Sequence, residues 1–307
     1  MVAGLFNFMN AMTLICGNKI LDLSRPAVMG IVNVTPDSFS DGGQLYLNEK
    51  VDLDKTLQTV ESMLADGADI IDIGGESTRP GASPVTTQQE LDRVLPVVQA
   101  VSERFDALIS VDTSTAQVIT EAAEAGAHLI NDVRALQREG ALQAAVAARL
   151  PVCLMHMQNQ PGSMQSNPSY VDVVTEVLDF LQQRKQTCLD AGITGGQILL
   201  DPGFGFGKTL EHNLALAGSL DRFVDTGQSL LLGVSRKTMI GQLINSNVDS
   251  RLTGSVTMAL LMAQSVAQRR AQTGCSSGMI LRVHDVRETV QALAVWQQTT
   301  NFKDEII

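Results

Sequence analysis

Eight short hydrophobic runs, each followed by a segment with helical periodicity, restrict most strongly how this chain can fold. Five of the runs are nearly continuous apolar strings, as is typical of parallel strands covered on both faces. The segments between them carry apolar residues at i, i+3, i+4 and i+7 and end near glycine, as crossover helices do. The runs lie at residues 27–33, 69–75, 108–112, 128–132, 152–156, 197–201, 230–236 and 279–285.

Eight such units within 307 residues predict a single closed (β/α)8 TIM barrel, an α/β fold, rather than an open doubly wound sheet. No Pro/Gly/Ser-rich linker or change of composition divides the chain. We therefore expect one barrel domain over residues 14–297, with a small hairpin at residues 14–24 that closes the barrel floor. Residues 1–13 are expected to form an irregular N-terminal extension and residues 298–307 a C-terminal tail.

The charge of the chain restricts its partners. The formal net charge of −11 argues against nucleic acid and anionic membrane surfaces, because both attract clustered Lys and Arg. Residues 1–16 are apolar but lack a basic n-region, and no other stretch reaches the roughly 18 apolar residues that a membrane span needs. Cys16, Cys153, Cys188 and Cys275 have no paired spacing, so neither a zinc site nor a disulfide framework is indicated, and a reducing cytoplasm fits best.

Almost every predicted strand has a polar residue at its carboxyl end. In a closed barrel these ends share one face, where the catalytic loops converge. Polar residues end strands in most proteins, so one of them alone would carry little weight, but a complete ring predicts a site. The ring consists of Asn33, Glu76, Asp112, Asn131 with Asp132, His156, Asp201, Arg236 with Lys237, and Arg282 with His284.

The ring divides into two kinds of chemistry. One set offers acceptors and an amide, which suit a flat heterocycle with amino, ring N–H and carbonyl groups along one edge. The other set lies on the first and last strands, which become neighbours when the barrel closes, and its cations and amide suit a diphosphate. The first set is Asp112, Asn131 and Asp201, and the second is Asn33, Arg282 and His284.

Two features of the sequence resemble sites but are interpreted otherwise. The string DPGFGFGKT at 201–209 resembles a phosphate-binding P-loop, yet Pro202 stands where the motif needs glycine, so we predict an ordinary Gly-rich βα loop. No G-x-G-x-x-G opens a helix after an early strand, which excludes a dinucleotide fingerprint. His156 has no partner visible in the sequence and is interpreted as a hydrogen-bonded scaffold residue rather than a general base.

Eight strings occur in an order that is specific when they are taken together. They resemble the sequences of dihydropteroate synthases over roughly residues 14–297. The resemblance implies that a 6-hydroxymethyl-7,8-dihydropterin diphosphate condenses with p-aminobenzoate to give 7,8-dihydropteroate and diphosphate in folate biosynthesis. The strings are MGIVNVTPDSFSDGG (29–43), IIDIGGESTRPGA (70–82), ISVDTS (109–114), LINDV (129–133), LMHMQ (154–158), LLDPGFGFGK (199–208), VSRKTMIG (234–241) and RVHDV (282–286).

The resemblance also implies a role for each site residue and an SN1-like path, in which diphosphate departs first and leaves a pterin methylene cation. Mg²⁺ held by Asn33 is expected to assist that departure. The catalytic residues would be Asp112, Asp201, Lys237, Arg282 and His284. The pterin would contact Asp112, Asn131, Met155, Asp201, Phe206, Gly233 and Lys237. The diphosphate would contact Asn33, Thr78, Arg79, Arg282 and His284, and p-aminobenzoate would contact Phe39, Thr78, Arg79, Pro80, Lys237 and Thr238.

Two further expectations come from the family. Sulfonamides, which resemble p-aminobenzoate, should compete for its pocket, and the protein should form a homodimer. The segment 256–281 is longer than the family usually has, which predicts an extended seventh helix that reaches about Gln268. The residues of that helix expected to be exposed and to contribute to the dimer interface are Leu260, Leu261, Met262 and Val266.

Two other functions compete with the synthase. A corrinoid-dependent methyltransferase domain uses a related pterin-binding barrel but does not need a diphosphate site, so the joint presence of STRPG, SRK and RVHD argues against it. A catalytically silent pterin-binding homologue is disfavoured because every expected catalytic position is filled. An assay of diphosphate release would separate this homologue from a synthase.

Overall fold

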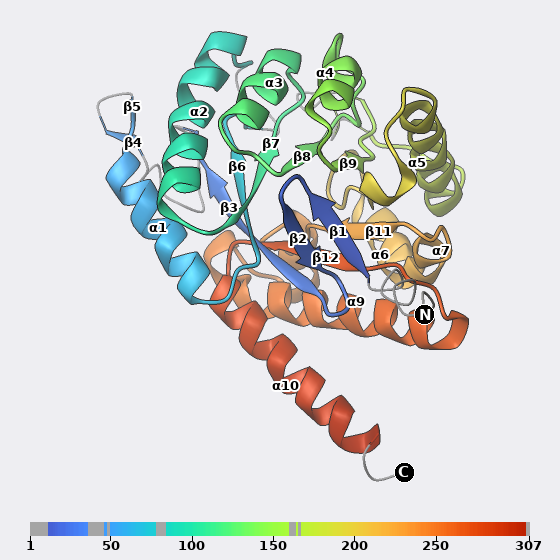
Figure 1. Ribbon diagram of the computed structural model, residues 1–307. Coiled ribbons are helices and arrows are strands. Elements are labelled where there is room, and N and C mark those ends of the chain that lie inside the picture. The colour runs from blue at the N-terminus through green and yellow to red at the C-terminus, as the bar shows by residue number, and fades with distance from the viewer. Residues whose placement is uncertain are drawn as a thin grey trace, which may run out of the picture.

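A computed structural model describes residues 12–35, 46–47, 50–77, 84–159, 164 and 167–304, and it contains a closed barrel (Figure 1). Parallel strands follow one another around it in the order β10, β11, β12, β3, β6, β7, β8 and β9. The predicted (β/α)8 barrel is therefore confirmed. The strands are β3 (Ala27–Asn33), β6 (Ile70–Gly74), β7 (Leu108–Asp112), β8 (Leu129–Asp132), β9 (Val152–Met155), β10 (Ile198–Asp201), β11 (Ser229–Leu232) and β12 (Met279–Val283).

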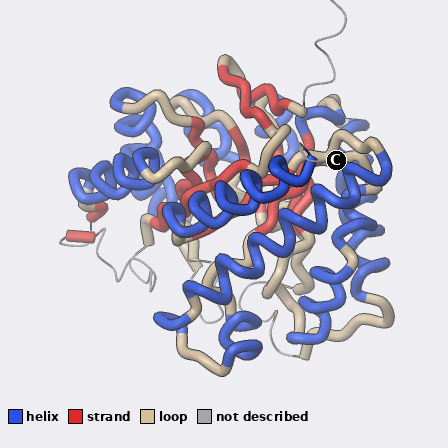
Figure 2. Tube along the Cα trace, turned by 90° about the horizontal axis from the view of Figure 1, so that it is seen from below, coloured by secondary structure: helices blue, strands red, loops and turns tan. Residues whose placement is uncertain are grey.

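Helices surround the strands on the outside (Figure 2). Several begin at a residue whose side chain satisfies a free N–H group of the first turn: Asp52 accepts from the amide of Lys55 at 3.1 Å before α1, and Asp172 caps α5. The helices are α1 (Leu53–Ala65), α2 (Thr87–Arg104), α3 (Ala116–Glu124), α4 (Ala141–Ala148), α5 (Val173–Asp190), α6 (Leu210–Gly218), α7 (Leu220–Val224), α8 (Thr238–Ile244), α9 (Leu252–Thr273) and α10 (Val286–Asp304). A two-stranded sheet of β4 (Tyr46–Leu47) and β5 (Lys50–Val51) precedes α1.

Side chains alternate between the two faces of each barrel strand. In β6, Ile71 and Ile73 pack outward against the helices, whereas Ile70 belongs to a separate apolar cluster inside the barrel. The same alternation turns Asp72 and Gly74 inward, above Ile70. The barrel interior is therefore apolar near the start of the strands and polar toward their carboxyl ends.

A hairpin of β1 (Thr13–Cys16) and β2 (Lys19–Asp22) closes the floor of the barrel, as predicted. Its apolar side chains, which include Leu14 and Leu21, join the inner cluster formed by the first residues of the barrel strands. Lys19 fastens the hairpin to the segment before β7 by donating to Asp106 at 2.6 Å and to the carbonyl of Ala107 at 2.9 Å.

The predicted extension of the seventh helix is present, but its exposed face was assigned incorrectly. Helix α9 runs to Thr273, beyond the expected end at Gln268. Met262 and Val266 are 2% and 1% exposed and belong to the core, so the prediction that they lie on an open surface is wrong. Leu261 is 54% exposed, and Leu260 is partly buried against the core.

The two ends of the chain differ in how far the structure describes them. Residues 1–11 lie outside the described residues, and β1 starts at Thr13. Helix α10 continues through residues 298–304, beyond the expected end of the barrel domain.

All four cysteines are free. Within the described ranges, we find no helix that combines the length and apolar character required to cross a membrane.

Candidate active site

The inward-facing residues at the carboxyl ends of the strands form a polar layer. The register of neighbouring strands aligns Asn33 with Gly74, Gly74 with Asp112, and Asp112 with Asn131. Gly74 leaves room there for its neighbour, because an added Cβ would lie 3.3 Å from the Cβ of Asp112. The barrel thus brings together three of the side chains that the sequence placed in one site.

Arg282 on β12 crosses the barrel interior to two carboxylates. Its Nε donates to Oδ2 of Asp72 at 2.6 Å, and its Nη2 donates to Oδ2 of Asp112 at 2.9 Å. Burial disfavours the charge of Arg282, but Asp72 and Asp112 together raise its pKa above the ordinary value. Arg282 therefore remains a cation that joins the heterocycle side of the ring to the last strand.

Asp72 is a site residue that the sequence analysis missed. Its side chain is 0% exposed, and its Oδ2 also accepts from Nδ2 of Asn131 at 3.3 Å. The run 69–75 was interpreted as a continuous apolar strand, so the acid within it was passed over. The available signal was an Asp at the inward phase of a strand, since a buried carboxylate needs a cation or hydrogen-bond donors.

Lys237 lies between the polar layer and the Gly-rich loop after β10. Its ammonium group donates to the carbonyl of Phe204 and lies 4.5 Å from the centre of the Phe206 ring. Gly205 makes space for it, because a Cβ there would lie 3.2 Å from Cδ of Lys237, and Gly233 is a neighbour whose added Cβ would be in ordinary contact with Nζ at 3.9 Å. The structure therefore brings together the predicted pterin contacts Lys237, Phe206 and Gly233.

Asp201 at the end of β10 faces this lysine. It is buried, and its Oδ1 accepts from the amide of Gly203 at 2.7 Å. Met155 pairs with Asp201 in the adjacent strand and is also buried. Asp201 and Met155 thus form the wall next to Lys237.

The ionisable groups of this cluster have altered pKa values. Burial raises the pKa of Asp112 to about 7, although Arg282 opposes the change. Burial also raises the pKa of Asp201, against the influence of Lys237. Burial lowers the pKa of Lys237 to about 8, and Asp201 opposes this shift. Two groups that titrate near neutrality in one largely buried cluster, here Asp112 and Lys237, are typical of a functional site.

The predicted diphosphate side is formed by β3 and β12. His284 is partly buried, and its Nδ1 lies 3.0 Å from Oγ of Ser235. Asn33 ends β3 and is also partly buried. Thr238 is exposed as the first residue of α8. The remaining predicted contacts to diphosphate and p-aminobenzoate lie outside the described residues: Phe39, Thr78, Arg79 and Pro80.

The donor groups present fit a magnesium ion only together with a substrate. No group of three or more His, Cys, Asp or Glu side chains able to hold a metal is found in the described part of the chain. An amide oxygen such as that of Asn33 is a suitable hard ligand, and Mg²⁺ commonly combines one or two protein oxygens with substrate phosphates and water. Asn33 is thus chemically suited to a metal that arrives with the diphosphate.

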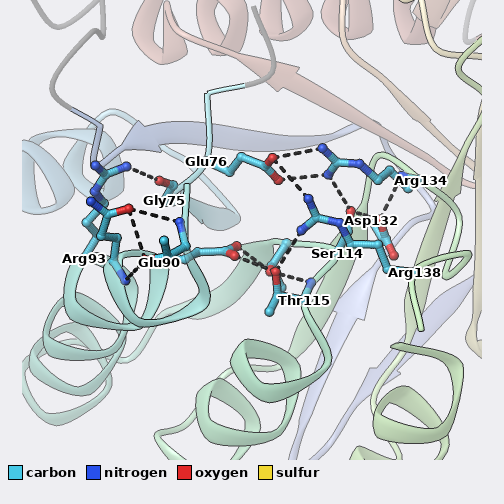
Figure 3. Close-up of polar contacts among 12 residues, drawn as sticks. Gly75, Glu76, Glu90, Arg93, Ser114, Thr115, Asp132, Arg134 and Arg138 are labelled. Carbon is cyan, nitrogen blue, oxygen red and sulfur yellow. Dashed lines mark hydrogen bonds and ion pairs between the residues drawn. The ribbon is translucent and has the colours of Figure 1, made fainter. Parts of the chain in front are cut away.

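Four members of the predicted ring make contacts outside the polar layer. Figure 3 shows Glu76 in a bidentate ion pair with Arg134, with both distances 2.9 Å. Asp132 accepts from Ser114 and from the amides of Arg134 and Leu136. Arg236 pairs with Asp285, and His156 contacts Lys208. These residues support the loops around the site.

The network in Figure 3 connects the loops after β6, β7 and β8. Glu90 on α2 accepts from Thr115 at 2.6 Å, Thr115 accepts from Arg138 at 3.0 Å, and Arg138 contacts Glu76 at 3.4 Å. Arg93 on α2 donates to the carbonyl of Gly75 at 2.9 Å. The loop that follows β6 is therefore fixed at its start by charged side chains from α2 and from the segment between β8 and α4.

Comparison with known proteins agrees with this geometry. The family described as "Pterin binding enzyme" matches residues 29–270. The dihydropteroate synthase of Haemophilus influenzae is 53% identical over 290 residues, which cover 94% of this chain and all of that protein. Two solved structures are also similar. The Yersinia pestis dihydropteroate synthase with a sulfonamide drug has a TM-score of 0.87 and 52% identity, and it covers 94% of this chain and 99% of its own. The Xanthomonas albilineans dihydropteroate synthase with 4-aminobenzoic acid has a TM-score of 0.83 and 44% identity, and the match covers 94% of this chain and 98% of that one. The chain belongs to the dihydropteroate synthase family of pterin-binding enzymes.

Proposed function

We propose that this protein condenses 6-hydroxymethyl-7,8-dihydropterin diphosphate with p-aminobenzoate to form 7,8-dihydropteroate. The observation that carries the proposal is the largely buried cluster of Asp112, Asp201, Lys237 and Arg282 at the carboxyl ends of the strands in a barrel of this family. Two carboxylates and two cations in one largely buried place can bind a polar heterocycle, and the carboxylates can stabilise positive charge that develops on it.

The heterocycle is bound by the polar layer and the wall beside it. Asp201 accepts hydrogen bonds from its amino and ring N–H groups, as a carboxylate can. The Nδ2 of Asn131 is directed to Asp72, which leaves Oδ1 as the acceptor that Asn131 presents to a ligand. Met155 and Phe206 supply apolar surface for the flat ring.

The reaction exchanges one bond for another at the pterin methylene carbon. The C–O bond to diphosphate breaks, and its electron pair leaves with the diphosphate oxygen. The resulting cation is delocalised into the dihydropterin, where Asp112 and Asp201 stabilise it. The neutral arylamine nitrogen then forms the C–N bond and releases one proton to solvent. No general base is required for this attack.

The leaving group is held on the side formed by the first and last strands. Arg282 and His284 donate to its oxygens, which suits a guanidinium and an imidazole facing an anion. Asn33 contributes an oxygen ligand for Mg²⁺. When bound, Mg²⁺ neutralises charge on the departing diphosphate.

Three further properties belong to the same proposal. Sulfonamides compete with p-aminobenzoate, since the Y. pestis relative was solved with such a drug and the X. albilineans relative with 4-aminobenzoic acid. The outer pocket that receives either ligand includes Lys237 and Thr238. The protein works as a homodimer. It works in the cytoplasm, a reducing compartment, which fits the free thiols of all four cysteines.

Diphosphate release with and without p-aminobenzoate tests the function. We expect release to depend on p-aminobenzoate and to be inhibited by a sulfonamide competitively with it. Asp112→Asn and Asp201→Asn should each lower turnover by about 10²-fold while the protein remains folded. A corrinoid methyltransferase would release no diphosphate, and a silent homologue would bind the pterin without turning it over.

A further inference from the structure

The Gly-rich loop after β10 folds around a buried lysine. Lys208, at the end of the P-loop-like string, is 4% exposed. Its Nζ donates to the carbonyls of Gly203 at 2.8 Å and Phe206 at 3.0 Å, and it lies 3.3 Å from the carbonyl of His156. The ammonium group thus binds the loop that leads to it, instead of a nucleotide phosphate.

The glycines of the loop permit this arrangement. Gly203, Gly205 and Gly207 have φ angles of +70°, +78° and +63°, which side chains other than glycine rarely adopt. A Cβ at Gly203 would lie 1.9 Å from the carbonyl oxygen of His156. With a positive φ angle at every second residue, the backbone turns the carbonyls of Gly203 and Phe206 toward Lys208, whereas the carbonyl of Phe204 faces Lys237.

His156 completes the surroundings of Lys208. Its Nδ1 lies 2.9 Å from Nζ of Lys208, and its ring packs against Phe180 with centroids 5.0 Å apart. Burial, with a contribution from Lys208, lowers the pKa of His156 to about 3. The imidazole is therefore neutral at physiological pH, and its Nδ1 accepts a hydrogen bond from the ammonium group.

One loop therefore contacts two ammonium groups from opposite directions. Lys208 binds it from within, while Lys237 binds the Phe204 carbonyl and lies over the Phe206 ring. Asn213 adds support from α6 by accepting from the amide of Gly205 at 2.7 Å. The position of Lys237 against this wall depends on the shape that Lys208 gives to the loop.

We propose that Lys208, held by His156, is a positioning residue that shapes the loop 202–207 from within and so places Phe206 and Lys237 for pterin binding. The inference rests on the proposed function, because it assigns these two residues to the pterin. It predicts an unequal defect: loss of the ammonium group disturbs both Phe206 and Lys237 in the pterin wall, whereas of the described p-aminobenzoate contacts only Lys237 binds this loop.

The decisive variant is Lys208→Met, which keeps the length of the side chain and removes its charge. We expect the KM for pterin diphosphate to rise about tenfold or more, because small displacements of binding groups have large effects. The KM for p-aminobenzoate should rise by a smaller factor, because Lys237 is the one described p-aminobenzoate contact that binds this loop. Lys185→Met, the same change on the outer helix α5, is the matched control and should leave both constants unchanged.

A pH profile provides a readout that simple destabilisation would not move. Burial lowers the pKa of Lys208, Asp201 opposes this shift and the charge of Lys237 adds to it, and such coupling between charges acts in both directions. Removing the charge of Lys208 should therefore raise the pKa of Lys237 and shift the alkaline limb of kcat/KM to higher pH. An unshifted limb in a folded Lys208→Met protein with unchanged KM values would overturn the inference.

A pair of substitutions at His156 covers the case in which Lys208→Met does not fold. His156→Asn keeps an acceptor near the position of Nδ1 and should behave almost as the original protein does, whereas His156→Leu should raise the KM for pterin diphosphate. Equal effects of the two changes on both substrates would contradict the inference. If the unaltered protein formed no dihydropteroate, the proposed function would fail instead, and pterin binding by calorimetry would still compare the variants.

Discussion

At the scale of single residues, the floor of the site is a buried carboxylate that touches two other site residues. Asp72 accepts from Nε of Arg282 and from Nδ2 of Asn131, and these bonds determine which donor and acceptor atoms remain for a ligand. Ser110 occupies the same level on the adjacent strand and is equally buried, but no hydrogen bond from it to Arg282 is found among the described side chains. Asp72 and Ser110 thus differ in their contacts while sharing depth and surroundings.

Asp72→Asn should disturb the site without opening the barrel. The substitution removes the counterion of Arg282, and breaking a buried ion pair on one side leaves the other charge poorly compensated. We expect turnover to fall by about 10- to 100-fold. Asp72 also contributes to the raised pKa of Asp112, so the acid limb of the pH profile should move to lower pH. Ser110→Ala is the control, and equal kinetics for the two variants would refute a special role for Asp72.

The unaltered enzyme should be active over a narrow pH range. Burial raises the pKa of Asp112 to about 7, and the proposed mechanism needs its ionised form, so activity should be lost as the pH falls through that value. Burial lowers the pKa of Lys237 to about 8, so its charge disappears as the pH rises above that value. A plot of kcat/KM against pH should therefore be bell-shaped, and Lys237→Met should remove the alkaline limb. A flat profile between pH 6 and 9 would be incompatible with both assignments.

At the scale of elements, apolar strings located the strands well because both faces of each barrel strand are covered. The same strings concealed Asp72, since a predominantly apolar run was taken as wholly apolar. The face of α9 was misjudged for a different reason. Its buried residues Ser255, Ala259, Met262 and Val266 follow helical spacing, and that stripe predicts the core face better than hydrophobicity alone. The loops after β3 and β6 carry family motifs, but their contacts depend on backbone positions that no local pattern specifies.

The observed buried face of α9 predicts which side-chain truncations will lower the free energy of unfolding. Met262→Ala removes a side chain from the core and should lower the free energy of unfolding by about 2–5 kcal/mol. Leu261→Ala changes the exposed neighbour and should alter it by less than about 1 kcal/mol. Urea unfolding followed by circular dichroism measures both. If Leu261→Ala were the more destabilising change, the orientation of the helix described above would be wrong.

At the scale of the whole molecule, the barrel has an apolar end closed by the hairpin and a polar end that carries the site. Exposed apolar side chains also occur on neighbouring outer helices: Leu243 and Ile244 on α8 are 43% and 45% exposed, and Leu261 on α9 is 54% exposed. Large apolar groups at the surface of adjacent elements are typical of surfaces that associate. They support the proposed homodimer.

Association can be measured directly by light scattering at micromolar protein. We expect twice the mass of one chain, and Leu261→Glu should shift the population toward monomer because it places a charge in an apolar contact. Lys55→Glu, an exposed change on α1, should leave the mass unchanged. A single chain mass for the unaltered protein would disprove the dimer while leaving the catalytic proposal intact.

The hairpin that closes the barrel floor also has a kinetic consequence. With Leu14 and Leu21 packed among the first residues of the strands, that end of the barrel is closed, so a ligand should reach the polar layer from the carboxyl ends of the strands. Of the groups proposed for the pterin, Asn131, Met155, Asp201 and Gly233 are buried, whereas Thr238 is exposed. We therefore expect the pterin substrate to bind before p-aminobenzoate, and p-aminobenzoate that binds first to slow the binding of the pterin.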